Sequence, residues 1–169
     1  MLSQINGFRP QTKLKLLYRG SQHGWLIEDF HARCDNQGAT LMLMRCKTGR
    51  VCGGYTAVSW LSPPFTGYYK YDPTAFLFSL DNRARFATKE PNQAVFHHKT
   101  CGPNFGNGSL KIAREPMNAE NAGTCCTKNM INAYYVETDS EGDSILTGEG
   151  KLSYITFTCV EIEIFKVML

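Results

Sequence analysis

The sequence lacks any apolar run long enough to cross a membrane. A spanning helix needs about 20 consecutive apolar residues, and no stretch of the 169-residue chain approaches that length. Residues 1–9 also lack the apolar segment of a secretory signal peptide. These absences predict a soluble, intracellular protein that does not insert into a membrane.

Charge of one sign is also scarce. The formal net charge is only +3, and Lys and Arg are scattered without a basic stripe, which argues against nucleic acid as a partner. Hydrophobic residues make up 43% and charged residues 20%, the ordinary balance of a folded domain. We expect residues 1–12 to be an N-terminal extension and residues 13–169 to be a single domain with its own core.

Several motifs of enzymes and ion-binding proteins are missing. No Gly-Lys-Ser/Thr follows a glycine-rich turn, which excludes a P-loop, and no GxSxG hydrolase elbow occurs. Residues 137–150 are acidic, but the sixth and twelfth positions counted from Asp139 are Ser144 and Gly150. A calcium-binding EF-hand needs Gly and Glu there. We therefore expect an acidic, solvated hairpin.

Seven cysteines are present, but no CxxC pair. An odd number without regular spacing does not suit a secreted disulfide framework and favours the reducing cytoplasm. His31 and Cys34 share a helical face, yet a zinc site would need further ligands. The adjacent His97 and His98 point to opposite sides of a strand. We predict no metal site and no cofactor.

Thiol chemistry is the main catalytic alternative. Cys101 lies close in sequence to His97 and His98, and Cys125-Cys126 is a vicinal pair. A nucleophilic cysteine needs such a neighbouring base or cation. Packing in a partly buried loop explains the same residues, so both interpretations stay open.

A carboxylate pair is the other chemical candidate. Glu161 and Glu163 fall on one face of the last predicted strand, about 7 Å apart by strand rise, and could be drawn as a glycosidase pair. Substrate-binding aromatics are not arranged around them, so a solvated strand face or an ion pair is favoured. The sequence thus indicates no catalytic residue.

Alternation of apolar and polar residues predicts a mainly β fold. Residues 41–44 are apolar on both faces, as in a strand packed inside a sandwich. Residues 26–34 have apolar positions at helical spacing but no capping residue before them. We expect a two-sheet antiparallel β-sandwich with one or two short flanking helices. The predicted strands are 13–18, one beginning at Thr40, 51–58, 76–80, 94–98, 110–113 and 154–167.

Residues 61–73 form a distinctive predicted loop. Prolines stiffen it, and aromatic side chains supply contact area. Such a loop either lies on its own domain or contacts a partner. Its binding candidates are Tyr68, Tyr69 and Tyr71, accompanied by Phe65, Pro63, Pro64 and Pro73.

Three signatures occur in order: LLYRGSQHGW followed by DFHARCDNQGATL and GGYT, then AFLFSL, then GPNFGNG. Together they resemble the TLDc domain of the oxidation resistance proteins, over residues 14–169. The resemblance implies a β-sandwich flanked by helices that binds protein partners and is not an enzyme. It also implies association with the vacuolar proton pump (V-ATPase) and a part in oxidative-stress resistance.

The resemblance also singles out individual positions. Arg19, Asp35 and Glu163 are its polar matches, and they are candidates either for binding or for a buried ion-pair network. Other matches are glycines that shape the backbone. Gly53 and Gly54 would permit a close approach or a bulge, and Gly102, Gly106 and Gly108 would permit turns with positive φ. The chain departs from the family pattern at Ser109, where an acidic residue is usual, and in NAGTCCTKNMINAYY.

Three functions from different classes follow from these observations. The first is regulation of the V-ATPase, which the resemblance implies. The second is a structural or adaptor role in a larger assembly, for example a cytoskeletal one, which the tyrosine-rich loop suggests. The third is a thiol-based antioxidant enzyme, which the cysteine count suggests. The sequence ranks them in that order.

Overall fold

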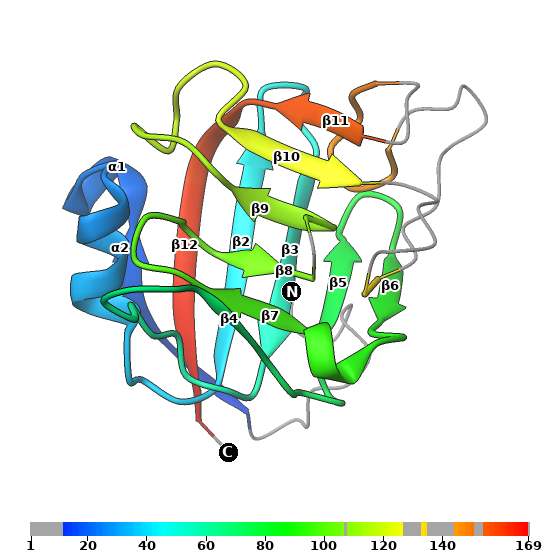
Figure 1. Ribbon diagram of the computed structural model, residues 1–169. Helices are drawn as coiled ribbons and strands as arrows, with labels where there is room; N and C mark the ends of the chain where they lie inside the picture. The colour runs from blue at the N-terminus through cyan, green and yellow to red at the C-terminus, as the bar shows by residue number, and fades with distance from the viewer. Residues whose placement is uncertain (1–11, 107, 127–132, 135–143, 151–153, 169) are drawn as a thin grey trace.

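Two antiparallel β-sheets packed face to face form the body of the protein in a computed structural model (Figure 1). The structure describes residues 12–106, 108–126, 133–134, 144–150 and 154–168. Within them, each sheet has six strands. The predicted two-sheet sandwich with few short helices is therefore confirmed.

The strands follow one another across each sheet in a fixed order. The first sheet runs β1 (Lys13–Arg19), β12 (Cys159–Met168), β2 (Thr40–Cys46), β3 (Val51–Thr56), β5 (Phe76–Ser79) and β6 (Ala84–Ala87). The second sheet runs β11 (Tyr154–Phe157), β10 (Gly123–Cys126), β9 (Leu110–Ile112), β8 (Asn104–Phe105), β7 (Val95–His97) and β4 (Tyr68–Lys70).

The helices are short. Two of them, α1 (Gly20–His23) and α2 (Ile27–Cys34), lie beside β1 and β12 at one edge of the first sheet (Figure 1), and a 3-10 turn, η2 (Pro91–Gln93), precedes β7. The predicted helix at residues 26–34 is confirmed as α2. Its first amides are satisfied by carboxylates: Leu26 N–H donates to Asp29 at 3.0 Å, and Ile27 N–H donates to Glu115 at 2.7 Å. A remote Glu115 thus replaces the capping residue that the sequence lacks.

The main core lies between the two sheets. Trp60 is buried at its centre, with its ring edge-on to Phe30 at 5.8 Å and to Phe105 at 5.5 Å between centroids. Its indole N–H donates to Thr40 Oγ1 at 2.9 Å, so this buried polar group is paired. Aromatic contacts between elements distant in sequence therefore join α2 to both sheets.

The adjacent glycines Gly53 and Gly54 lie inside β3, and each lets an aromatic ring approach one face of the sheet. A Cβ on Gly54 would meet the Phe105 ring at 2.7 Å, and a Cβ on Gly53 would meet the Met42 carbonyl oxygen at 2.0 Å and the Phe78 ring at 2.7 Å. These close approaches lie within β3, whose pairing with β2 and β5 keeps a regular register.

Part of the face of the first sheet that points away from the second sheet is also apolar. Leu41, Phe76, Phe78 and Val167 form a buried cluster there. Because side chains alternate along a strand, Met42 and Met44 of the same β2 point into the main core. The prediction that residues 41–44 are apolar on both faces is confirmed.

The predicted single strand over residues 154–167 is wrong in one respect. The chain forms β11 in the second sheet and then β12 in the first, with the break at Thr158. The Thr158 carbonyl accepts from Lys47 N–H at 2.9 Å, and its hydroxyl accepts from Asn121 N–H at 3.1 Å. These hydrogen bonds to other segments hold Thr158 where the chain passes from one sheet to the other. An alternating sequence pattern does not show where such a change of sheet occurs.

Two loop predictions also need correction. Part of the predicted loop 61–73 is the strand β4, which pairs with β7. In the acidic stretch, the described residues 144–150 are not a solvated hairpin, because Ser144, Leu146 and Thr147 are buried. The Ser144 carbonyl closes a turn by accepting from Gly148 N–H at 2.7 Å. The acidic positions Asp139, Glu141 and Asp143 lie outside the described residues.

Candidate functional site

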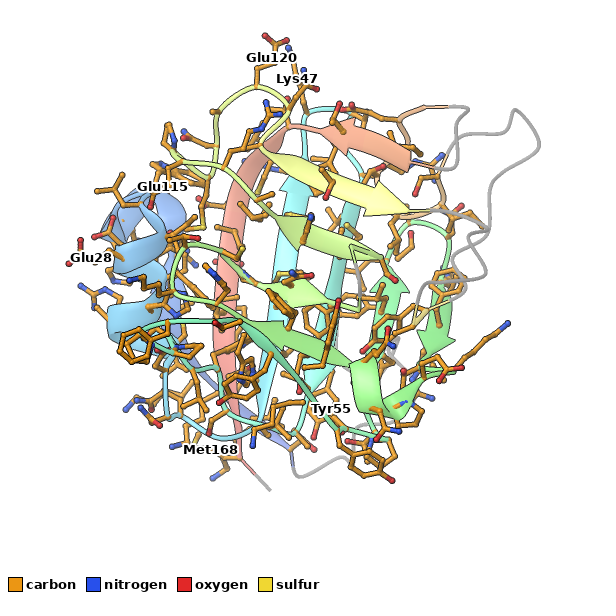
Figure 2. All side chains as sticks on the ribbon, viewed as in Figure 1. Glu28, Lys47, Tyr55, Glu115, Glu120 and Met168 are labelled. Atoms are coloured by element: carbon orange, nitrogen blue, oxygen red, sulfur yellow. The ribbon has the colours of Figure 1, made fainter. Side chains whose placement is uncertain are left out.

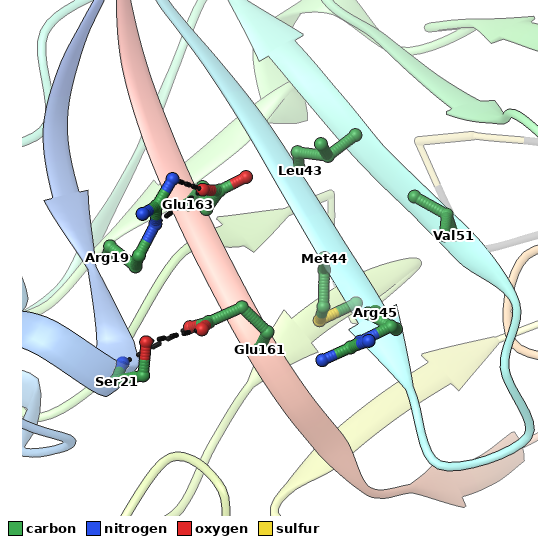
Figure 3. Close-up of a pocket in the computed structure, with 8 residues that line it drawn as sticks. All are labelled: Arg19, Ser21, Leu43, Met44, Arg45, Val51, Glu161 and Glu163. Carbon is green, nitrogen blue, oxygen red and sulfur yellow. Dashed lines mark hydrogen bonds and ion pairs between the residues drawn. The ribbon is translucent and has the colours of Figure 1, made fainter.

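A charged pocket of about 310 Å³ lies where β1, α1, β12, β2 and β3 meet (Figure 3). It is on the face of the first sheet that points away from the second sheet, because Glu163 pairs with Leu43 across the strands while Ile162 and Ile164 point into the main core. The residues that line it are Arg19, Ser21, Leu43, Met44, Arg45, Val51, Glu161 and Glu163.

The structure brings the predicted residues Arg19 and Glu163 together in this pocket. They are opposed in the β1–β12 register, and Arg19 Nε donates to Glu163 Oε1 at 2.6 Å, with a second guanidinium nitrogen also against that oxygen. Their side chains are 34% and 18% exposed. Solvent screens an ion pair that is this exposed, so the pair adds little free energy to folding. It does join β1 to β12 through their side chains.

Glu161 is engaged as well. Ser21 donates to it twice, from its hydroxyl at 2.5 Å and from its backbone N–H at 3.2 Å, which ties α1 to β12 (Figure 3). The two carboxylates drawn as a glycosidase pair therefore both accept hydrogen bonds from their own chain. Arg45 faces Glu161 in the strand register. The pocket thus presents two arginines and two glutamates, and each carboxylate accepts a hydrogen bond from another segment of the chain.

Asp35 is not among the residues that line the charged pocket. Its carboxylate lies 2.8 Å from Nδ1 of His31, and His31 Nε2 lies 3.2 Å from the His98 carbonyl and 3.1 Å from the Cys101 carbonyl. Asp35 thus orients a ring that joins α2 to the segment after β7. Both nitrogens of the His31 ring thus lie against oxygen atoms. Burial raises the pKa of the neighbouring Cys34 thiol.

The glycines expected in turns behave differently from one another. Gly106 and Gly108 have φ of 64° and 86°, as expected for glycine in tight turns. The expectation of positive φ is wrong for Gly102. There a Cβ would lie 3.0 Å from Met117 Sδ and 3.1 Å from Ile112 Cβ, so this position is limited by packing and not by backbone conformation.

Aromatic side chains gather at the β4 edge of the second sheet. Tyr69 packs on Phe96 at 4.9 Å and Tyr68 on His97 at 5.6 Å between ring centroids, so these two partly cover their own domain. Phe65 is 88% exposed and Tyr71 is 59% exposed. The sequence left open whether this loop lies on its own domain or contacts a partner. The structure shows that Tyr68 and Tyr69 pack on the domain and that Phe65 and Tyr71 are exposed.

His97 is an unusual residue whose importance sequence reasoning missed. It is 1% exposed, and neither ring nitrogen has a hydrogen-bond partner among the residues that the structure describes. Burial is the largest cause that lowers its pKa, from 6.5 to about 4, and Lys70 adds to the effect. The alternation of β7 does place His97 inward, but no sequence signal shows that its nitrogens are left unpaired.

The thiol candidates are poorly suited to nucleophilic chemistry. Burial raises the pKa of the Cys101 thiol, and its neighbour Lys111 only partly opposes this. Cys125 is buried with its sulfur 3.5 Å from Ser144 Oγ. The Cys126 side chain lies outside the described residues. Burial therefore favours the protonated thiol of Cys101 near neutral pH.

Sequence reasoning also missed a group of buried thiols in the main core. Cys52 interacts with Cys46, and the nearby Cys125 and Cys159 join them in raising its pKa well above the usual range. These residues come from β2, β3, β10 and β12. Strand pairing within the first sheet brings Cys46, Cys52 and Cys159 together, and the packing of the second sheet against it adds Cys125. Across the described ranges, no group of three or more His, Cys, Asp or Glu residues is placed to hold a metal ion.

The described residues define a two-sheet antiparallel β-sandwich with short helices at one edge. Within them, no helix has the length and apolar character needed to cross a membrane. The family model of the TLDc domain matches residues 1–168, so the chain belongs to the TLDc domain family, and the resemblance seen in the sequence is confirmed. A comparison with curated proteins gave no match.

Proposed function

We propose that this TLDc domain is a non-enzymatic protein-binding module that acts in the cytoplasm as a regulator of the V-ATPase, with oxidative-stress resistance as an indirect result. The observation that carries the proposal is the family match over residues 1–168. Two features support the non-enzymatic part: Glu161 and Glu163 are engaged by their own chain, and burial raises the pKa of the Cys101 thiol.

The direct test uses purified V-ATPase and a saturating amount of this protein. We expect a change in ATP hydrolysis and in the fraction of pump whose cytoplasmic and membrane sectors stay assembled. The same protein unfolded by heat serves as the control. A pump whose hydrolysis and assembly are both unaffected by the folded protein would contradict the proposal.

A structural or adaptor role in a larger assembly is the second candidate. The observation that favours it is the exposure of Phe65 and Tyr71 beside the edge strand β4, since exposed aromatic clusters mark protein interaction sites.

A thiol-based enzyme is the third candidate. Peroxide consumption that falls in Cys101→Ser or Cys125→Ser, but not in the exposed control Ser21→Ala, would revive that class.

A further inference from the structure

Strand β4 forms one edge of the second sheet. It pairs with β7 on one side, in the register Tyr68 to His97, Tyr69 to Phe96 and Lys70 to Val95. In the part of the chain that the structure describes, no strand pairs with its other side. An edge strand carries N–H and C=O groups that can pair with another chain, so the backbone itself offers a docking site.

The surface around this edge is apolar and held in place. Phe65 and Tyr71 flank β4 with most of their side chains in solvent. Gly67 lies so close to β7 that a Cβ there would meet the Phe96 ring at 2.4 Å and the His97 carbonyl oxygen at 2.7 Å. This close packing fixes the loop before β4, and a preformed surface reduces the entropy lost on binding.

Positive charge is in excess at this edge. Residues 61–71 and 91–101, which build β4, η2 and β7 with their flanks, contain Lys70 and Lys99 but no Asp or Glu. The adjacent Asp72 is buried, and it accepts hydrogen bonds from Thr56 Oγ1 and from Ala57 N–H at 2.7 Å each. Its charge is therefore directed inward. Glu90, before η2, is exposed and acidic, but Lys70 and Lys99 leave an excess of positive charge for a partner.

We propose that the β4 edge binds an extended, acidic segment of a partner protein, which adds to the second sheet as a further strand. The segment's backbone pairs with β4, its apolar side chains contact Phe65 and Tyr71, and its carboxylates lie near Lys70 and Lys99. The inference rests on the proposed protein-binding function, but it does not require the V-ATPase to be the partner.

The test is selection from a displayed library of random peptides of about twelve residues. We expect acidic sequences with apolar residues at alternate positions to be enriched. In Phe65→Ser/Tyr71→Ser, the affinity of the best synthetic peptide should fall at least about tenfold. Lys70→Glu should also weaken it. The matched control is Leu26→Ser, which changes an exposed apolar residue near α2 and should leave affinity unchanged.

Backbone pairing has its own readout. The best peptide is made in two forms, each with N-methyl groups on one set of alternate residues. Because only alternate amides of an added strand face the edge, one form should lose binding and the other should keep it. Equal behaviour of the two forms would overturn strand addition, and so would enrichment of basic peptides or of none.

Two other occupants would also overturn the inference. The first is a phosphatidylserine-containing vesicle that binds through Phe65 and Tyr71 when no peptide binds. The second is a dimer of this chain, measured by sedimentation, that the variant Phe65→Ser/Tyr71→Ser abolishes. The pump assay on the unmodified protein is separate. If the peptide binds but the pump assay shows no effect, the inference about β4 stands. Only the proposed role as a regulator of the V-ATPase is then contradicted.

Discussion

At the scale of single residues, His97 shows how burial changes chemistry. Its ring packs against Trp60 and Tyr68, at 5.9 Å and 5.6 Å between centroids, and the described part of the chain supplies no hydrogen-bond partner for either nitrogen. Because the pKa is lowered to about 4, His97 takes up a proton at a lower pH in the folded protein than in the unfolded chain. Lys70 and His31 also oppose the charged ring, whereas Asp35 favours it.

This difference predicts a loss of stability in acid. Since the His97 pKa is lower in the folded state, stability is unaffected above pH 6.5 and falls as the pH drops from 6.5 towards about 4. The loss from this residue should reach about 2 to 3 kcal/mol. Urea unfolding at several pH values measures it. His97→Phe should flatten the profile, whereas the control His98→Gln should keep it; equal profiles in all three proteins would contradict the assignment.

A second residue-scale prediction concerns the glycines. Alanine at Gly53 must displace the backbone oxygen of Met42, alanine at Gly54 must displace the buried Phe105 ring, and alanine at Gly102 needs only a small shift of Met117. Thermal unfolding should therefore rank the losses Gly53 > Gly54 > Gly102, with Gly54→Ala costing about 1 to 3 kcal/mol. A larger loss at Gly102 than at Gly54 would show that packing against Phe105 is not the constraint.

At the scale of secondary structure elements, several boundaries depend on distant residues. Helix α2 begins without a capping residue because Glu115, from the segment after β9, accepts the Ile27 N–H. Strand β12 separates from β11 at Thr158 because that residue bonds to Lys47 and Asn121. The sequence predicted that these elements exist, but their ends were decided by partners that a local pattern does not identify.

Removal of the Glu115 carboxylate should loosen the start of α2. Glu115→Ala leaves the Ile27 N–H without its acceptor, and we expect a loss of about 1 kcal/mol together with faster hydrogen exchange at Ile27. Glu120→Ala is the control, because Glu120 makes only an exposed ion pair with Lys47 at 3.7 Å (Figure 2). If both variants lose the same stability, Glu115 does not act as a cap.

At the scale of the whole molecule, the candidate sites consist of residues far apart in the chain. Arg19 and Glu163 are 144 positions apart, and they meet because β1 pairs with β12. The same topology places β4 at an edge of the second sheet. The family resemblance singled out Arg19, Asp35 and Glu163 together, and loop composition singled out the tyrosines. The structure separates Asp35 from the other two and pairs it with His31.

The sequence by itself determined the class of the fold and the family. Alternating and two-sided apolar segments require sheets with buried faces, and short ordered signatures suffice to mark the TLDc domain. The tertiary structure alone decided which sheet each strand joined, which carboxylate met which donor and which histidine was left unpaired. The period of a strand fixes only the direction of its side chains, whereas their partners depend on strand pairing across the whole chain.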